Sequence, residues 1–180
     1  MSAAVERHAQ LPKVLVVGIG NPDRADDGAG PLVAKRLAGR LPSGVKLMAR
    51  SGDILCLVED WTGFDAAVCI DAAAPIEMPG RIHRIDAGAR QLPHGLSFPS
   101  SHAFGLAEAI ALADTLRLLP QTVIVYAIEG ASFEDGAAMT PEVTAAAAEV
   151  ADRVVAEVAW LRSGKPGPTT SKLESQGASP

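Results

Sequence analysis

The sequence contains few of the features that mark secreted, membrane-spanning or nucleic-acid-binding proteins. No segment approaches the roughly 18 consecutive apolar residues of a membrane span, and the opening segment, MSAAVERHAQLPK, has no apolar core of the kind found in signal peptides. Lys and Arg form no cluster, and the 180-residue chain has a formal net charge of −5. This charge balance argues against a nucleic-acid partner or an anionic membrane surface. We therefore expect a cytoplasmic protein with neither nucleic acid nor membrane among its partners.

Cysteine and aromatic residues are also scarce. The only cysteines, Cys56 and Cys69, form no C-x-x-C motif. Two isolated thiols in a chain without a secretory signal are typical of reduced cysteines in the core of a cytoplasmic protein. Four Phe, two Trp and one Tyr are too few to build the aromatic platforms on which nucleic-acid bases stack.

What the sequence does contain is a regular alternation of strand-like and helical segments. Hydrophobic residues make up 48% of the chain, which is enough for the core of one domain. Short apolar runs predict buried strands, and apolar residues spaced three or four apart predict helices. Strands are expected at residues 13–18, 45–50, 65–70, 80–86 (at an edge) and 122–128, and helices at residues 31–41, 54–61, 102–119 and 140–162.

This order of segments predicts one α/β domain. Strands that alternate with helices form a mostly parallel, twisted sheet covered by helices on both faces. We expect a three-layer α/β/α sandwich over residues 13–162, preceded by an N-terminal extension, residues 1–12. Residues 163–180 are rich in Gly, Ser, Pro and Thr and are expected to form a flexible tail. Ligands of such sheets bind beyond the carboxyl ends of the strands.

The segment VVGIGNPDRADDGAGPL, residues 16–32, concentrates glycine and aspartate between a predicted strand and a predicted helix. It contains a Gly-x-Gly motif, but Asp23 replaces the third glycine of a dinucleotide-binding loop, and no Gly-Lys-Ser/Thr follows as in a P-loop. The carboxylates of Asp23, Asp26 and Asp27 would repel a phosphate. The segment therefore argues against nucleotide binding. Two interpretations stay open for Asp26 and Asp27: a functional role, or capping of free N–H groups at the start of a helix.

Three side chains are candidate ligands of a divalent cation. Asp27 ends the acidic segment, Asp71 directly follows a predicted buried strand, and His102 lies at or next to the start of a predicted helix. Ser100 or Ser101 would cap that helix, whose N-terminus keeps an imidazole neutral, as a metal ligand must be. Two carboxylates and one imidazole can bind a divalent cation and leave room for outside ligands. Each residue also has a local alternative, since a lone aspartate often forms a turn and a lone histidine is often only a surface or core residue.

At these residues the sequence resembles the hydrogenase maturation proteases, which trim the C-terminus of the large subunit of [NiFe]-hydrogenases. The resemblance rests on VLVVGIGNPDRADDGAGPLVA, AAVCIDAA and SSHAFGLAEAI, whose order and spacing cover residues 13–162. It implies an α/β/α fold and an endopeptidase that removes the C-terminal extension of a nickel-loaded large-subunit precursor. It also implies that Asp27, Asp71 and His102 are the metal ligands and that the nickel is contributed by the substrate.

The sequence departs from the family pattern at several positions. Some relatives carry glutamate where Asp27 stands, so the reach of this carboxylate is one methylene shorter here. The segment ARSGDILCL, with Arg50 and Asp53, lacks the usual acid and the Gly-Thr turn that follows it. The segment IEGAS, after the last predicted strand, lacks a proline that is common at that place.

The catalytic group is not identified by the sequence. No serine or cysteine has a recognisable histidine partner, so an acyl-enzyme is not supported. Cys69, two residues before Asp71, is expected to be an inert, packed thiol. A metal-polarised carbonyl or a metal-bound water fits better. In an alternative scheme, Asp27 acts as a general base instead. Two alternatives use the same three residues: an assembly factor that binds the nickel-loaded subunit without cleaving it, and another metal-dependent hydrolase on the same fold.

Overall fold

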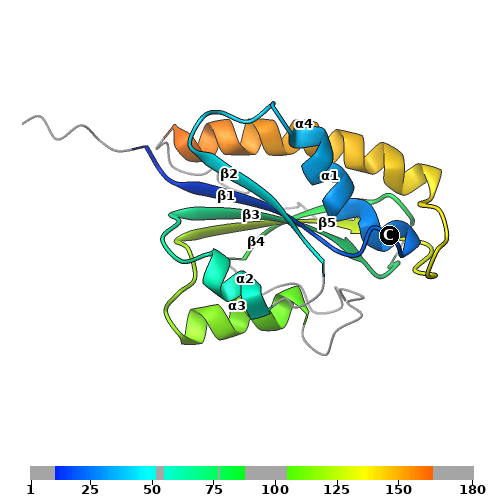
Figure 1. Ribbon diagram of the computed structural model, residues 1–180, viewed down its shortest axis with the longest axis horizontal. Coiled ribbons are helices and arrows are strands. Elements are labelled where there is room, and N and C mark those ends of the chain that lie inside the picture. Colours follow the sequence, from blue (N-terminus) through cyan, green and yellow to red (C-terminus); the bar gives the residue numbers. More distant parts are fainter. Residues whose placement is uncertain (1–10, 52–54, 77, 88–104, 164–180) are drawn as a thin grey trace, which may run out of the picture.

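Five strands form one twisted sheet in the order β2-β1-β3-β5-β4 (Figure 1). The computed structural model describes residues 11–51, 55–76, 78–87 and 105–163. β4 (Ile82–Asp86) pairs antiparallel with β5 at one edge, as the sequence predicts. The other four strands are parallel: β2 (Val45–Arg50), β1 (Val14–Ile19), β3 (Ala66–Ala73) and β5 (Thr122–Glu129).

Helices cover both faces of this sheet. α1 (Ala29–Leu37) and α4 (Pro141–Arg162) lie on one face, and α2 (Leu55–Asp60) and α3 (Leu106–Thr115) lie on the other (Figure 1). A short 3-10 helix, η1 (Ala25–Gly28), leads directly into α1. The predicted single-domain α/β/α sandwich with a mostly parallel sheet is thus confirmed. Within the described part of the chain, no helix has the length and apolar character that a membrane crossing requires.

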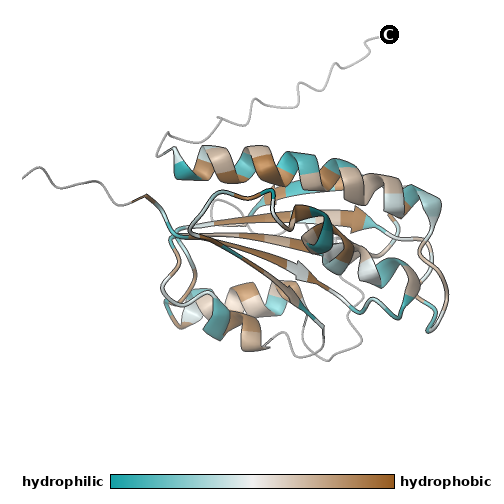
Figure 2. Ribbon diagram, turned by 45° about the horizontal axis from the view of Figure 1, so that its top comes forward, coloured by the Kyte–Doolittle hydropathy of each residue, from teal (hydrophilic) through white to brown (hydrophobic). Residues whose placement is uncertain are grey.

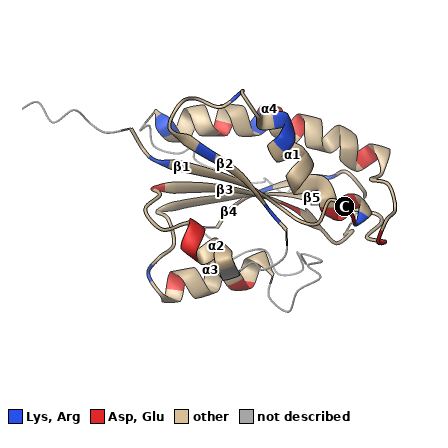
Figure 3. Ribbon diagram, viewed as in Figure 1, with Lys and Arg blue, Asp and Glu red and all other residues tan. Residues whose placement is uncertain are grey.

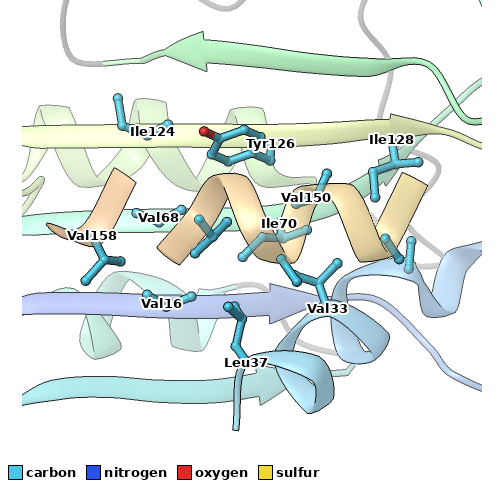
Figure 4. Packing of buried hydrophobic residues seen from close by; sticks show 14 of the residues in the cluster. Val16, Val33, Leu37, Val68, Ile70, Ile124, Tyr126, Ile128, Val150 and Val158 are labelled. Atoms are coloured by element: carbon cyan, nitrogen blue, oxygen red, sulfur yellow. The ribbon is translucent and has the colours of Figure 1, made fainter. Parts of the chain in front are cut away.

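Two hydrophobic cores fill the spaces between the layers, and Figure 2 shows the apolar character of the strands between them. Because alternate residues of a strand point to opposite faces, the central strands contribute to both cores. Figure 4 shows the core under α1 and α4, with Val16, Val33, Leu37, Val68, Ile70, Ile124, Ile128, Val150 and Val158. The core on the other face includes Leu15, Val17, Trp61, Leu106 and Ile110.

The boundaries of β3, α1 and α3 differ most from the predicted ones. β3 continues to Ala73, so Asp71 lies within the strand and not directly after it. α1 begins at Ala29 and ends at Leu37, well before Pro42, because Ala38 adopts an extended ψ of 124° and Gly39 a φ of +75°.

The predicted helix 102–119 is also shorter at both ends. α3 begins at Leu106 and ends at Thr115, and Arg117 has a positive φ of 57° that no α-helix accommodates. Leu116, expected on the apolar face of the helix, is therefore 53% exposed.

Candidate functional site

The order of the strands creates a switch point between β1 and β3. The chain leaves β1 for β2 on one side and later returns to β3 on the other side. In sheets of this kind a crevice forms beyond the carboxyl ends of the two strands, because their connections diverge there. η1 follows β1 and carries Asp27, and β3 carries Asp71 near its carboxyl end. Both predicted carboxylates therefore lie at the carboxyl ends of the parallel strands, as expected. Figure 1 places the segment that leads into α4 at the same end of the sheet.

Two glycines bring the acidic segment onto the sheet. A Cβ atom on Gly30 would lie 2.2 Å from the carbonyl oxygen of Ile19 and 2.5 Å from that of Ile70, so only glycine lets α1 approach the ends of β1 and β3. Gly20 has a φ of +131°, and a Cβ atom there would lie 1.9 Å from the carbonyl oxygen of Asp27. The glycines of this segment thus serve close packing that places Asp27 beside Asp71.

The carboxylate of Asp27 is only 4% exposed and is oriented by its neighbours. Its Oδ2 atom accepts hydrogen bonds from the backbone N–H of Asn21 at 3.1 Å and from Nη1 of Arg24 at 3.4 Å. Arg24 is held in turn by the carbonyl oxygen of Phe133 at 3.2 Å and by Asp135 at 3.0 Å. This network ties Asp27 to the connection between β5 and α4.

Asp71 is a buried acid with a strongly perturbed charge. Its side chain is 4% exposed, and its Oδ1 atom accepts the backbone N–H of Ala72 at 2.8 Å. Burial raises the pKa of Asp71 well above its usual range, and the negative charge of Asp27 raises it further. The bond from Ala72 acts in the opposite direction without reversing the shift. Two mutually repelling carboxylates in a buried position form a favourable environment for a cation.

The third predicted ligand, His102, lies outside the described residues, as do Ser100 and Ser101. Among the residues that the structure describes, no three His, Cys, Asp or Glu side chains form a group that could hold a metal ion. The predicted serine cap of α3 is wrong. Gly105 is the N-cap, and its N–H donates to Glu108 at 3.0 Å. His102 precedes the first residue of α3 by four positions in the sequence.

Asp26 has a structural role that differs from that of Asp27. Its fully buried carboxylate accepts the N–H groups of Ala131 at 2.8 Å and Ser132 at 3.1 Å. It also accepts the N–H of Thr140 at 2.7 Å and the hydroxyl of the same residue at 2.9 Å. Asp26 therefore has a structural role, but not the predicted one of capping its own helix, because the groups it binds belong to the β5–α4 connection and to Thr140, the N-cap of α4.

Cys69 is a buried, packed thiol, as expected. It is fully buried in β3, and burial raises its pKa to about 12, with a further contribution from the charge of Asp71. Both cysteines are free thiols.

The loop that departs from the family pattern has a structural role where it is described. The guanidinium of Arg50 donates two hydrogen bonds of 2.6 Å to Asp60, and the carbonyl oxygen of Arg50 accepts the N–H of Gly20 at 2.9 Å. Asp53 lies outside the described residues.

Two charged groups near the site were missed by the sequence analysis. Arg24 lies beside Asp27, and Figure 3 shows both basic and acidic positions at the end of the sheet where α1 begins. Glu129, the last residue of β5, is fully buried, and its carboxylate lies 2.6 Å from Nε2 of His83. An acid at the end of a buried strand is a signal that the sequence contains for Glu129, just as it does for Asp71.

Comparisons with known sequences indicate one family. Residues 32–157 match the family model HycI, hydrogenase maturation protease. The chain is 30% identical over 150 residues to the hydrogenase expression/formation protein HoxM of Azotobacter vinelandii, covering 81% of this chain and 72% of that protein. It is also 30% identical over 128 residues to the protein HupM of Azotobacter chroococcum mcd 1, covering 69% of this chain but only 60% of HupM.

Solved structures share the fold. The hydrogenase maturating endopeptidase HybD from E. coli superposes with a TM-score of 0.70 at 23% identity, covering 84% of this chain and 94% of HybD. The [NiFe] hydrogenase maturation protease HycI from Thermococcus kodakarensis KOD1 gives a TM-score of 0.67 at 19% identity, covering 84% of this chain and 95% of HycI.

Proposed function

The chain belongs to the hydrogenase maturation protease family, and from this we propose that it is an endopeptidase that removes the C-terminal extension of a nickel-loaded [NiFe]-hydrogenase large-subunit precursor. The observation that carries the proposal is the pair of buried carboxylates, Asp27 and Asp71, at the switch point between β1 and β3. Their position matches the place where α/β sheets bind ligands. Their charge matches a divalent cation and opposes a phosphate.

Recognition of the metal follows from the electrostatics of this pair. Asp71 keeps its proton more tightly than an ordinary carboxyl group because it is buried and because Asp27 lies close by. A nickel ion carried by the precursor would compensate both charges and favour the ionised form of Asp71. We propose His102 as the third ligand. Three protein ligands leave coordination positions for groups of the precursor itself.

The proposed reaction is the hydrolysis of one peptide bond near the nickel of the substrate. A divalent cation can polarise the carbonyl group of that bond or help to activate a water molecule. As an alternative to its role as a ligand, Asp27 is the candidate general base, because Arg24 and Asn21 hold its carboxylate in place beside Asp71. Cys69 has no part in this scheme, since its thiol is buried and stays protonated at neutral pH.

The test is incubation of the purified protein with nickel-loaded precursor, followed by mass measurement of the precursor. We expect the precursor to lose the mass of its C-terminal extension. A stable complex with a precursor of unchanged mass would instead indicate an assembly factor that does not cleave. Hydrolysis of small amides or phosphoesters in the absence of any precursor would indicate another metal-dependent hydrolase.

A first variant tests the third ligand. His102→Ala is expected to reduce cleavage by roughly 100-fold or more, because loss of a direct ligand should cost at least as much as loss of a group that only orients one. Asp27→Glu, which keeps the charge, is expected to retain activity. Cys69→Ala, which removes a thiol close to Asp71 in the sequence, is the control and should cleave like the wild type. Full cleavage by a His102→Ala variant that circular dichroism shows to be folded would remove His102 from the site.

A further inference from the structure

Two large apolar side chains are exposed at the same edge of the sheet as the proposed metal site. Ile76 is 51% exposed and Met78 is 60% exposed, and both lie in the loop between β3 and β4. The other exposed large hydrophobic residues of the described chain lie elsewhere. Leu11 precedes β1, and Leu116 and Leu118 precede β5, so these three belong to the amino edge of the sheet.

The loop that carries Ile76 and Met78 is held in place by a buried carboxylate. Oε2 of Glu129 accepts the backbone N–H of Ile76 at 2.9 Å and that of Met78 at 3.0 Å. Oε1 of the same residue lies 2.6 Å from Nε2 of His83, and the N–H of Gly80 donates to the carbonyl oxygen of Glu129 at 2.7 Å. Burying a carboxylate is unfavourable unless it is hydrogen-bonded. Here those bonds hold the backbone N–H groups of Ile76 and Met78 at the end of β5.

This loop is continuous with the proposed metal site. It leaves β3 two residues after Asp71, and Ile76 is the fifth residue after Asp71 in the sequence. Glu129 is followed by Gly130, whose N–H donates to the carbonyl oxygen of Ala73 at 2.9 Å. The next residue, Ala131, is bound by Asp26. The exposed side chains therefore border the surface onto which the proposed substrate must bind.

Ile76 and Met78 form a small apolar patch, and its size and composition suit an extended peptide as the binding partner. A stable contact between two folded proteins buries about 1,200 Å² or more, which two side chains cannot supply, so a second copy of this chain is a poor match. The segment 164–180 of the chain itself contains a single large apolar residue, Leu173, and is a poor match as well. We propose that Ile76 and Met78 form a docking surface for apolar residues in the C-terminal segment of the precursor. This inference rests on the proposed function.

The test compares two double variants. One removes apolar side chains near the carboxyl ends of the strands, and the other removes similar side chains near the amino ends. Ile76→Ser/Met78→Ser is expected to raise the KM for nickel-loaded precursor, and its dissociation constant, by roughly tenfold or more, which is typical of losing two contacts that matter in an interface. The kcat should stay close to that of the wild type, because neither side chain belongs to the proposed metal site. Leu116→Ser/Leu118→Ser is the control and should change neither constant. Melting temperatures show whether both variants are folded.

The other outcomes distinguish failure of this inference from failure of the proposed function. An unchanged dissociation constant for Ile76→Ser/Met78→Ser, or an equal weakening in the control, shows that this patch does not recognise the precursor. A wild-type dimer that only the first double variant dissociates assigns the patch to a second copy of the chain. If the wild type binds the precursor but does not cleave it, the proposed activity fails while the docking comparison still stands. If the wild type does not bind the precursor at all, both proposals fail.

Discussion

Asp71→Asn is expected to abolish cleavage of the nickel-loaded precursor while leaving the domain at least as stable as the wild type at neutral pH. The neutral amide is a poor metal ligand, so the variant loses the proposed contact with nickel. Its Oδ1 atom can still accept the N–H of Ala72, which binds Asp71 at 2.8 Å. The substitution also removes a buried negative charge that Asp27 repels.

The pH dependence of stability gives this prediction a second readout. The pKa of Asp71 is raised in the folded state, so the folded state binds this proton more tightly than the unfolded state does. The contribution of Asp71 to the free energy of unfolding therefore falls as the pH rises from the usual carboxyl range through the raised pKa. Asp71→Asn should lack this fall, which melting temperatures measured across the pH range would show.

A surface variant is the matched control for Asp71→Asn. Asp152 is an exposed residue of α4 that pairs with Arg40 at 2.7 Å. An exposed pair of this kind contributes little to stability. Asp152→Asn should therefore leave cleavage and the pH profile unchanged. Wild-type cleavage by folded Asp71→Asn would refute the role proposed for this carboxylate.

Asp26→Ala is expected to cause a large loss of stability, whereas Asp71→Asn should leave the stability at neutral pH unchanged or higher. The substitution leaves three backbone N–H groups and one hydroxyl, those of Ala131, Ser132 and Thr140, without their carboxylate. Each buried donor that loses its partner costs roughly 1–3 kcal/mol, so we expect a total loss of about 3 kcal/mol or more. For a domain of this size that corresponds to a fall in melting temperature of roughly 6–12 °C.

Thr140→Val separates one of these bonds from the others. It removes only the hydroxyl that donates to Asp26 at 2.9 Å and keeps the backbone N–H of the same residue. Its cost should be about 1 kcal/mol. The prediction for Asp26 fails if calorimetry finds Asp26→Ala as stable as Thr140→Val or as the wild type.

Local patterns in the sequence were sufficient to predict the layers of the fold. β2 covers the predicted residues 45–50, because an apolar run between turn-forming residues determines a short strand. β3 was predicted too short because Asp71 interrupts the apolar run. The strand nevertheless continues, since Ala72 and Ala73 pair with Ile128 and Glu129 of β5. That pairing is a long-range contact, which periodicity within one segment does not reveal.

In the candidate site, only residues near the carboxyl ends of parallel strands could be predicted, because ligands of such sheets bind there. Asp27 and Asp71 follow from the position of acids after parallel strands. The partners of Arg24 and Glu129 come from distant segments, namely Phe133 for Arg24 and Ile76 for Glu129. No local spacing relates such residues.

A buried network between β4, β5 and α4 could not be predicted either, because its residues come from distant segments of the sequence. Glu157 accepts two hydrogen bonds from Arg84, at 2.6 Å and 2.8 Å, and one from the hydroxyl of Tyr126 at 2.9 Å. These residues come from α4, β4 and β5, so their contact depends on the topology of the sheet. An acid on the apolar face of α4 is the one local sign of this network.

The most direct test of the central claim is to present the purified protein with the same precursor in nickel-loaded and nickel-free form and to measure the mass of each product. If Asp27 and Asp71 recognise the nickel of the substrate, the nickel-loaded precursor loses its C-terminal extension and the nickel-free precursor keeps its full mass. Equal cleavage of both forms would contradict the claim that these buried carboxylates recognise the metal.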